Sequence, residues 1–242
     1  MRGARSRRVR GEHRPGFGLE AARARTAGNG GDVKRGILIV FEGLDGSGKS
    51  TQLRRAAETL RARGLEVVET REPTEGAWGR RIREMAGSGA LVPPETELAW
   101  FFEDRREHMR EVVEPALAAG RIVLSDRSYL STVAYQGARG LDPRQILADS
   151  EAEFVAPDLV LLFEISPEVG LSRVAARGGR AEPAFEERGF QERVGALFDT
   201  LEVAGLHRID AGRSVEEIEA RVLAAIDRCL SEPEDAGPRR AQ

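Results

Sequence analysis

The chain has 242 residues, of which 40% are hydrophobic, and this is enough for one domain with a substantial core. No apolar run reaches the roughly 18 residues that a membrane span requires. The single cysteine, Cys229, excludes an intramolecular disulfide and is typical of a protein in the reducing cytoplasm. The net charge of −3 is unevenly spread, because residues 1–35 hold ten basic and three acidic residues, leaving 27 basic and 37 acidic ones beyond. This acidic body argues against a general nucleic-acid-binding surface.

The two ends of the chain differ in composition from the part between them. Residues 1–35 contain many arginines and glycines, with no apolar periodicity and no signal-peptide core. We interpret them as a disordered basic extension; a tail that binds nucleic acid and a start codon placed too early are the alternatives. Residues 231–242 are polar, contain two prolines and are predicted to form a flexible tail. Residues 36–230 are therefore expected to form the folded domain.

Strand and helix patterns alternate along this domain, which is typical of an α/β fold with a parallel sheet flanked by helices on both faces. Short apolar runs predict five strands, at 37–41, 66–70, 121–125, 159–164 and 206–209. Apolar residues at helical spacing predict helices at 49–63, 79–86 and 95–119, the last starting after Pro93 and Pro94. Two further helices are expected to begin near Pro167 and Ser214.

The segment 43–51 reads GLDGSGKST and follows the pattern G-x-x-x-x-G-K-[ST], between an apolar strand and an amphipathic helix. In such a loop the backbone N–H groups surround phosphate oxygens at the positive end of the helix, the lysine reaches the transferring phosphate and the serine can bind Mg²⁺. Lys49 is the only lysine besides Lys34, in a chain that otherwise uses arginine. The residues predicted to bind ATP are Gly43, Leu44, Asp45, Gly46, Ser47, Gly48, Lys49, Ser50 and Thr51.

Other motifs narrow the class of phosphate-loop protein. The N-K-x-D element of guanine-specific GTPases is absent, since the only asparagine is Asn29, outside the domain. The Leu-Ser-Gly-Gly-Gln element of transporter ATPases is absent as well. Small phosphotransferases, nucleoside monophosphate kinases among them, remain.

Charged residues follow two of the predicted strands. Asp126 comes directly after the strand 121–125, where a carboxylate can hold Mg²⁺ through water; a helix N-cap is a second and compatible interpretation. Arg127 follows it, and Arg71 follows the strand 66–70. Because the carboxyl ends of parallel strands meet at one edge of a sheet, either arginine could clamp the phosphate of an acceptor.

Four sequence elements occur in order: FEGLDGSGKST at 41–51, TREP at 70–73, FFEDRREH at 101–108 and DRSYLSTVAYQG at 126–137. Together they resemble the thymidylate kinases of the bacterial type, over about residues 36–230. The resemblance implies a three-layer P-loop nucleoside monophosphate kinase fold with a short lid at about 173–190. It also implies a homodimer, ATP and dTMP as substrates, Mg²⁺ as cofactor, dTDP as a product on the way to dTTP, and no need for a membrane or nucleic acid.

The same resemblance implies roles for residues that would bind the acceptor. Phe101 would stack on the thymine ring, Arg105 would hydrogen-bond a base oxygen, and Tyr135 would lie against the sugar and reject a 2′-hydroxyl. The alternative for Phe101 is plain core, because its neighbours form an apolar run. The implied acceptor-binding residues are Arg71, Phe101, Arg105, Arg127, Thr132, Tyr135 and Gln136.

A lid that supplies positive charge is expected, because the variable positions of the phosphate loop carry no basic residue. Arg177 and Arg180 flank the pair Gly178-Gly179, and closure would bring an arginine onto the transferring phosphoryl group. Asp45 would face the acceptor. The implied catalytic residues are Asp45, Lys49, Asp126, Arg177 and Arg180, with Ser50 and Asp126 at the metal.

Three departures from the family pattern affect the finer acceptor contacts and the lid: the segment 74–76, Ser128 and Gly179. Two alternative functions also stay open on the sequence. One is a kinase for another acceptor, such as dUMP, a purine monophosphate or a deoxynucleoside. The other is a nucleotide-binding module without catalytic activity.

Overall fold

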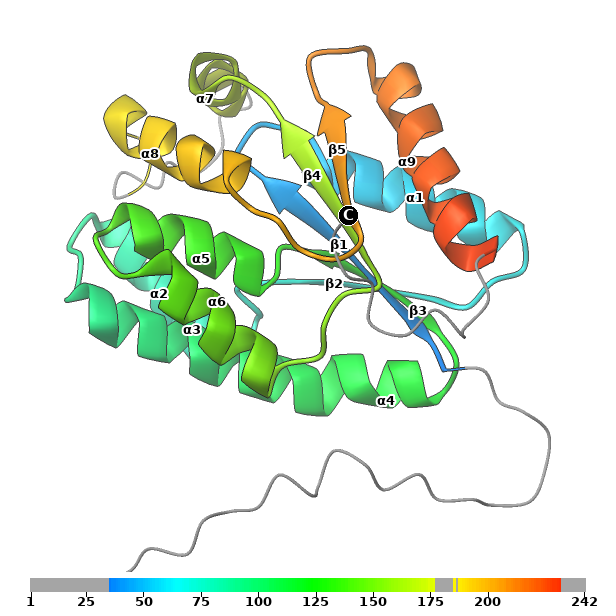
Figure 1. The fold of residues 1–242 in the computed structure, drawn as a ribbon, viewed down its shortest axis with the longest axis horizontal. Helices are drawn as coiled ribbons and strands as arrows, with labels where there is room; N and C mark the ends of the chain where they lie inside the picture. The colour runs from blue at the N-terminus through cyan, green and yellow to red at the C-terminus, as the bar shows by residue number, and fades with distance from the viewer. Residues whose placement is uncertain (1–34, 177–184, 186, 232–242) are drawn as a thin grey trace, which may run out of the picture. The chain divides into compact units, whose positions relative to one another are not determined.

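The computed structural model describes residues 35–176, 185 and 187–231 (Figure 1). Within them, five strands form a parallel sheet in the order β2-β3-β1-β4-β5. The strands are β1 (Ile37–Gly43), β2 (Val67–Arg71), β3 (Ile122–Asp126), β4 (Leu159–Glu164) and β5 (Leu206–Asp210). The predicted α/β class and all five predicted strands are confirmed.

The central strand β1 shows why the strands of this sheet are continuous apolar runs in the sequence. Leu38 and Val40 belong to one hydrophobic cluster, whereas Ile39 and Phe41 belong to a second cluster on the other face of the sheet. All four side chains are buried. Since both faces of the sheet are covered, alternating polar residues have no place in this strand.

Helices cover both faces of the sheet (Figure 1). The helices α1 (Lys49–Ala62) and α9 (Val215–Ser231) pack on one face. On the opposite face α4 contacts β3 and α5 contacts β1, with other helices packed around them. The remaining helices are α2 (Ala77–Ser88), α3 (Pro94–His108), α4 (Glu114–Ala118), α5 (Tyr129–Ala138), α6 (Pro143–Glu153), α7 (Pro167–Ala176) and α8 (Arg188–Asp199).

The helix predicted over 95–119 is interrupted. Helix α3 passes through a π-helical turn, Met109–Val113, into the short helix α4. Pro115 lies in the first turn of α4, and its missing N–H removes one regular i→i−4 hydrogen bond. The start of α3 at Pro94 agrees with the sequence.

Three helices were not predicted: α5, α6 and α8. Helix α5 is buried from Tyr129 to Gln136, so it lacks the one-sided apolar stripe by which a surface helix is recognised. Helix α6 begins after Asp142, whose carboxylate accepts from the backbone N–H of Arg144 at 2.9 Å.

The ends of the chain and half of the predicted lid, residues 177–184 and 186, lie outside the described residues. This applies to the predicted extension except Arg35, to the tail after Ser231, and to both predicted lid arginines. In the part of the chain that the structure describes, no helix has the length and apolar character needed to cross a membrane.

Candidate active site

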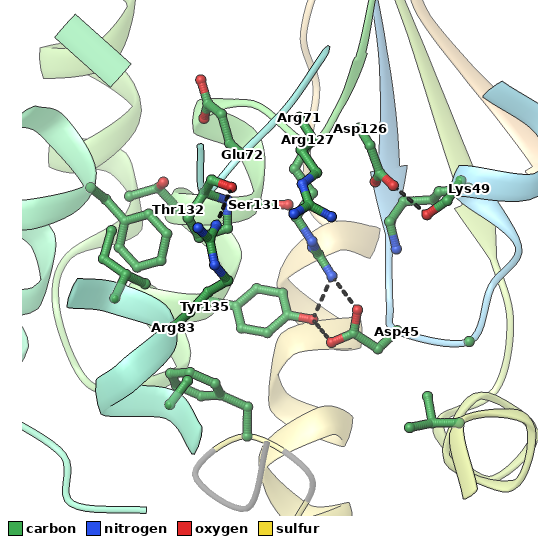
Figure 2. A pocket seen from close by; sticks show the side chains of 18 of the residues that line it. Asp45, Lys49, Arg71, Glu72, Arg83, Asp126, Arg127, Ser131, Thr132 and Tyr135 are labelled. Atoms are coloured by element: carbon green, nitrogen blue, oxygen red, sulfur yellow. Dashed lines mark hydrogen bonds and ion pairs between the residues drawn. The ribbon is translucent and has the colours of Figure 1, made fainter. Parts of the chain in front are cut away.

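The carboxyl ends of three neighbouring strands bring the predicted phosphate-binding residues together. Arg71 at the end of β2 lies opposite Asp126 at the end of β3, and Asp126 in turn pairs with Phe41 of β1. A cavity of about 410 Å³ lies at this edge, and Figure 2 shows the side chains around it. The expected convergence of these strand ends is therefore present in the structure.

Most of the predicted site residues line this cavity. Those that do are Asp45, Gly46, Gly48, Lys49, Ser50, Arg71, Phe101, Asp126, Arg127, Thr132, Tyr135 and Gln136. Gly43 and Leu44 line a separate cavity instead. Ser47, Thr51 and Arg105 line neither of these two cavities. The sequence analysis did not single out the lining residues Glu72, Pro73, Ile82, Arg83, Ala86, Ser131, Val174 and Phe185.

The phosphate loop is closely packed against α7. Gly46 has a φ of +77°, and a Cβ there would lie 2.2 Å from the carbonyl oxygen of Gly170. A Cβ on Gly170 would in turn lie 2.6 Å from the carbonyl oxygen of Asp45. The loop therefore has a fixed position on the helix that leads toward the predicted lid.

Lys49 is buried at the first turn of α1 and points into the phosphate loop. Its Nζ donates to the carbonyl oxygens of Gly43 at 2.9 Å and Leu44 at 2.8 Å. Burial, together with the positive charge of Arg127, lowers the pKa of Lys49 to about 8. An anionic ligand in the cavity would restore the preference for the charged form.

Arg127 lies between the phosphate loop and α5, with a left-handed backbone at φ +77°. Its guanidinium donates to Asp45 Oδ1 at 2.6 Å, to Ser131 Oγ at 2.7 Å and to the Tyr135 hydroxyl at 3.3 Å. Burial alone would raise the pKa of Asp45, but the charges of Arg127 and Lys49 hold it below its usual value. Asp45 is therefore ionised and fixes the direction of the arginine.

Ser50 and Asp126, the two residues predicted to bind the metal, lie within hydrogen-bond distance of each other. The Ser50 hydroxyl donates to Asp126 Oδ2 across the mouth of the phosphate loop. The interpretation of Asp126 as a helix N-cap is wrong, because Ser128 caps α5 by accepting from the N–H of Leu130 at 3.3 Å. A hydroxyl and a carboxylate oxygen are the hard ligands that Mg²⁺ prefers.

The cavity wall also contains an aromatic ring and an amide. Phe101 lies in the cavity wall, whereas its neighbour Phe102 packs on Phe154 in the core with ring centroids 5.3 Å apart. The core alternative for Phe101 therefore does not hold. Gln136 is 0% exposed, and neither its Oε1 nor its Nε2 has a hydrogen-bond partner among the described residues. Such atoms carry a desolvation cost that a ligand can relieve.

Arg105, which the family resemblance assigned to the thymine, is not among the residues that line this cavity. Its Nε and Nη2 donate to Glu72 Oε2 at 2.9 and 2.6 Å, and Nη2 also donates to Thr132 Oγ1 at 2.9 Å. Both partners line the cavity. The third nitrogen of the guanidinium, Nη1, is buried and has no hydrogen-bond partner among the described residues.

Glu42 was missed by the sequence analysis, although it interrupts the apolar strand β1 with an acid. It is 0% exposed, and burial raises the pKa of its carboxyl group. Its Oε1 accepts from the N–H and the hydroxyl of Ser128, both at 2.7 Å, and its Oε2 accepts from the Ser131 hydroxyl at 2.5 Å. The serine at position 128 therefore adds a side-chain bond to the backbone bond that holds the start of α5, the helix that carries Thr132, Tyr135 and Gln136.

The departure at 74–76 is accommodated within the loop after β2. Thr74 donates through its N–H and its hydroxyl to Asp104, at 2.8 and 2.6 Å. Glu75 pairs with Arg71 and, at 2.7 Å, with Arg83. Both arginines thus have a carboxylate partner at the edge of the cavity.

The structure describes residues 173–176, 185 and 187–190 of the predicted lid. Arg177 and Arg180 lie outside the described residues. Arg173 donates to the carbonyl oxygen of Ala211 at 3.1 Å and lines the separate cavity beside β4 and β5. This arginine therefore faces away from the cavity that holds Lys49 and Arg127.

The phosphate loop and the arginines Arg71 and Arg127 share one cavity at the switch point of a parallel sheet. The fold and the site define a P-loop kinase of nucleoside monophosphates. Comparison with known proteins makes this specific: the thymidylate kinase family model matches residues 41–222, and the chain belongs to the thymidylate kinase family.

Curated relatives support the assignment. A thymidylate kinase of Akkermansia muciniphila is 45% identical over 193 residues, covering 80% of this chain and 92% of its own. One from Desulfotalea psychrophila is 40% identical over 195 residues, covering 81% of this chain and 96% of its own. One from Xanthomonas euvesicatoria is 41% identical over 197 residues, with coverages of 81% and 86%. The chain is thus an ATP-dependent phosphotransferase that converts dTMP to dTDP, in a family that uses a divalent metal, and the predicted family and activity are confirmed.

Proposed function

We propose that the γ-phosphoryl group of ATP, held at the phosphate loop, is transferred in line to the 5′-phosphate of dTMP bound along the same cavity. The observation that carries this proposal is the order of side chains in Figure 2. Lys49 and Asp126 lie at one end, Thr132 at the other, and Arg127 with Tyr135 between them. A nucleotide lying along this line has its phosphate beside the donor and its base at the far end.

Positioning and charge neutralisation account for the transfer. The 5′-phosphate of dTMP is already anionic near neutral pH, so no general base is needed. Arg127 would share its guanidinium between Asp45 and the acceptor phosphate, with Arg71 at the edge. Lys49 would stabilise charge on the transferring group.

Ser50 and Asp126 would hold Mg²⁺, which would neutralise charge on the donor phosphates. We expect EDTA to reduce turnover to background and added Mg²⁺ to restore it. The Asp126→Asn variant should need on the order of tenfold more Mg²⁺ for half-maximal turnover, because it loses a charged ligand. Asp142→Asn, at the N-cap of α6, serves as the control. An equal Mg²⁺ requirement in both variants would contradict the role of Asp126.

The base end of the cavity favours an oxo-pyrimidine with a protonated ring nitrogen. Thymine presents an N3–H donor next to carbonyl acceptors, and a glutamine amide offers the matching acceptor and donor. Cytosine presents an acceptor at N3 beside the donor of its N4 amine, so it would need the amide of Gln136 in the opposite orientation. Tyr135 would reject ribonucleotides by its position near the sugar.

We therefore expect kcat/KM to be highest with dTMP in a panel that also contains dUMP, dCMP, dGMP and UMP. The Gln136→Leu variant should lose roughly 10- to 100-fold in kcat/KM for dTMP, the cost of one or two unmade buried hydrogen bonds, with the KM for ATP unchanged. Gln145→Leu, on an exposed position of α6, is the control. Another acceptor ahead of dTMP by tenfold would contradict the proposed acceptor site.

Three further proposals rest on the family and on composition. The lid arginines Arg177 and Arg180 would supply positive charge to the transferring group. The chain would form a homodimer through its helices, as the family resemblance implies. A cytoplasmic location is supported by the requirement for ATP and by the single cysteine.

A further inference from the structure

A buried hydrogen-bonded chain leads from Thr70 on β2 to the cavity wall. The Thr70 hydroxyl lies 2.6 Å from His108 Nε2, and His108 Nδ1 lies 2.9 Å from Glu72 Oε1. The other oxygen of Glu72 accepts both bonds from Arg105. The side chains of His108 and Arg105 are 1% exposed and that of Glu72 is 4% exposed.

The charge of Glu72 determines which groups donate and which accept in this series of hydrogen bonds. Burial alone would raise the pKa of Glu72, but Arg105 and His108 hold it below its usual value. An ionised carboxylate only accepts, so Nδ1 of His108 carries a proton and donates to Oε1. His108 and Arg105 thus hold one oxygen each, which fixes the rotation of the Glu72 carboxylate.

This series of hydrogen bonds ends at the hydroxyl group of Thr132 in the cavity wall. Thr132 Oγ1 accepts from Arg105 Nη2, which leaves the hydroxyl hydrogen of Thr132 available to another acceptor. Thr132 lines the cavity next to Gln136. A carbonyl oxygen of a bound base is a suitable partner for this donor.

We propose that His108 is a positioning residue for the acceptor base. It acts through Glu72, which orients Arg105 and thereby the Thr132 hydroxyl. This inference rests on the proposed placement of the base at the Thr132 and Gln136 end of the cavity. Without the bond from Nδ1, the Glu72 carboxylate can rotate, and Arg105 loses the fixed geometry of its two bonds to Oε2.

Two substitutions of His108 separate this role from simple packing. The amide nitrogen of asparagine lies near the position of Nδ1, whereas that of glutamine lies near Nε2. The His108→Asn variant should therefore keep the bond to Glu72, with a dTMP KM within about twofold of the parent. The His108→Gln variant should raise the dTMP KM about tenfold, with kcat and the KM for ATP within about twofold. Thermal unfolding of both variants measures the loss of packing.

The outcomes distinguish the inference from the function on which it rests. A dTMP KM that stays at the parent value in His108→Gln, or that rises equally in both variants, would overturn the positioning role. If Thr132→Val also left the dTMP KM unchanged, the placement of the base would be wrong as well. If Thr132→Val raised it and His108→Gln did not, only the role of His108 would fail. Should His108→Gln not fold, Thr70→Val removes the outer bond alone and should raise the dTMP KM by about threefold.

Discussion

Replacement of Lys49 by methionine should lower kcat by on the order of a thousandfold or more. The ammonium is buried and fixed by the Gly43 and Leu44 carbonyl oxygens, so it is oriented before the donor phosphate arrives. Arg127, which lines the same cavity, does not take the place of Lys49, because its guanidinium is paired with Asp45. Turnover with saturating ATP and dTMP is the measurement, and near-normal turnover would contradict the phosphate-loop assignment.

Unfolding measurements provide the control for Lys49→Met. Burial and Arg127 lower the pKa of Lys49 from 10.5 to about 8. The unfolded chain therefore binds more protons between these values, and the stability of the parent rises with pH across this range. Below pH 8, without nucleotide, the variant should be more stable than the parent by up to roughly 3 kcal/mol. The gap should narrow between pH 8 and 10 in urea unfolding, and loss of activity with this stability excludes misfolding.

The double variant Arg177→Ala, Arg180→Ala should also lower kcat by on the order of a thousandfold, since an arginine supplied to the transferring phosphoryl group is worth this much. The phosphate loop has no basic residue at its variable positions. Among the described residues, the cavity arginines Arg71, Arg83 and Arg127 are each paired with a carboxylate. We therefore expect extra positive charge to come from another segment when the donor is bound.

Single variants and a control variant show which lid arginine carries the effect. Each single replacement, measured by kcat with both substrates saturating, shows which of Arg177 and Arg180 carries the effect. Arg173→Ala is the control, because its guanidinium binds the Ala211 carbonyl beside another cavity. If all of these variants kept the parent turnover, the lid would not supply the charge. If Arg173→Ala alone lost turnover, the charge would come from the start of the lid.

Local sequence patterns were enough to predict β1, the phosphate loop after it and the charged residues at the end of β3. The strand β1 and the loop after it depend on neighbouring residues: an apolar run, then glycines, then Lys49. Asp126 and Arg127 follow a strand that is equally apolar, and the parallel register then brings them to the same edge. These predictions needed only the period of a strand and the rule that strand ends converge.

The positions of the residues predicted to bind the acceptor depend on tertiary packing, which no local sequence pattern encodes. Arg105 lies four residues after Phe101 on α3, but Phe101 lines the cavity whereas Arg105 is held by Glu72 and Thr132, which line it. Glu72 comes from the loop after β2 and Thr132 from α5, so their meeting is a tertiary event. Helix α5 itself was not predicted, because its sides are buried and its sequence lacks a polar face.

The contact between Gly46 and Gly170 restricts how this enzyme can change over generations. Each position lacks room for a single methyl group, because the other backbone lies 2.2 to 2.6 Å from where that group would be. Replacing one glycine cannot be offset by shrinking its partner, which already has no side chain. A substitution at either position therefore requires the backbone to shift, so the phosphate loop and the start of α7 constrain each other's sequence.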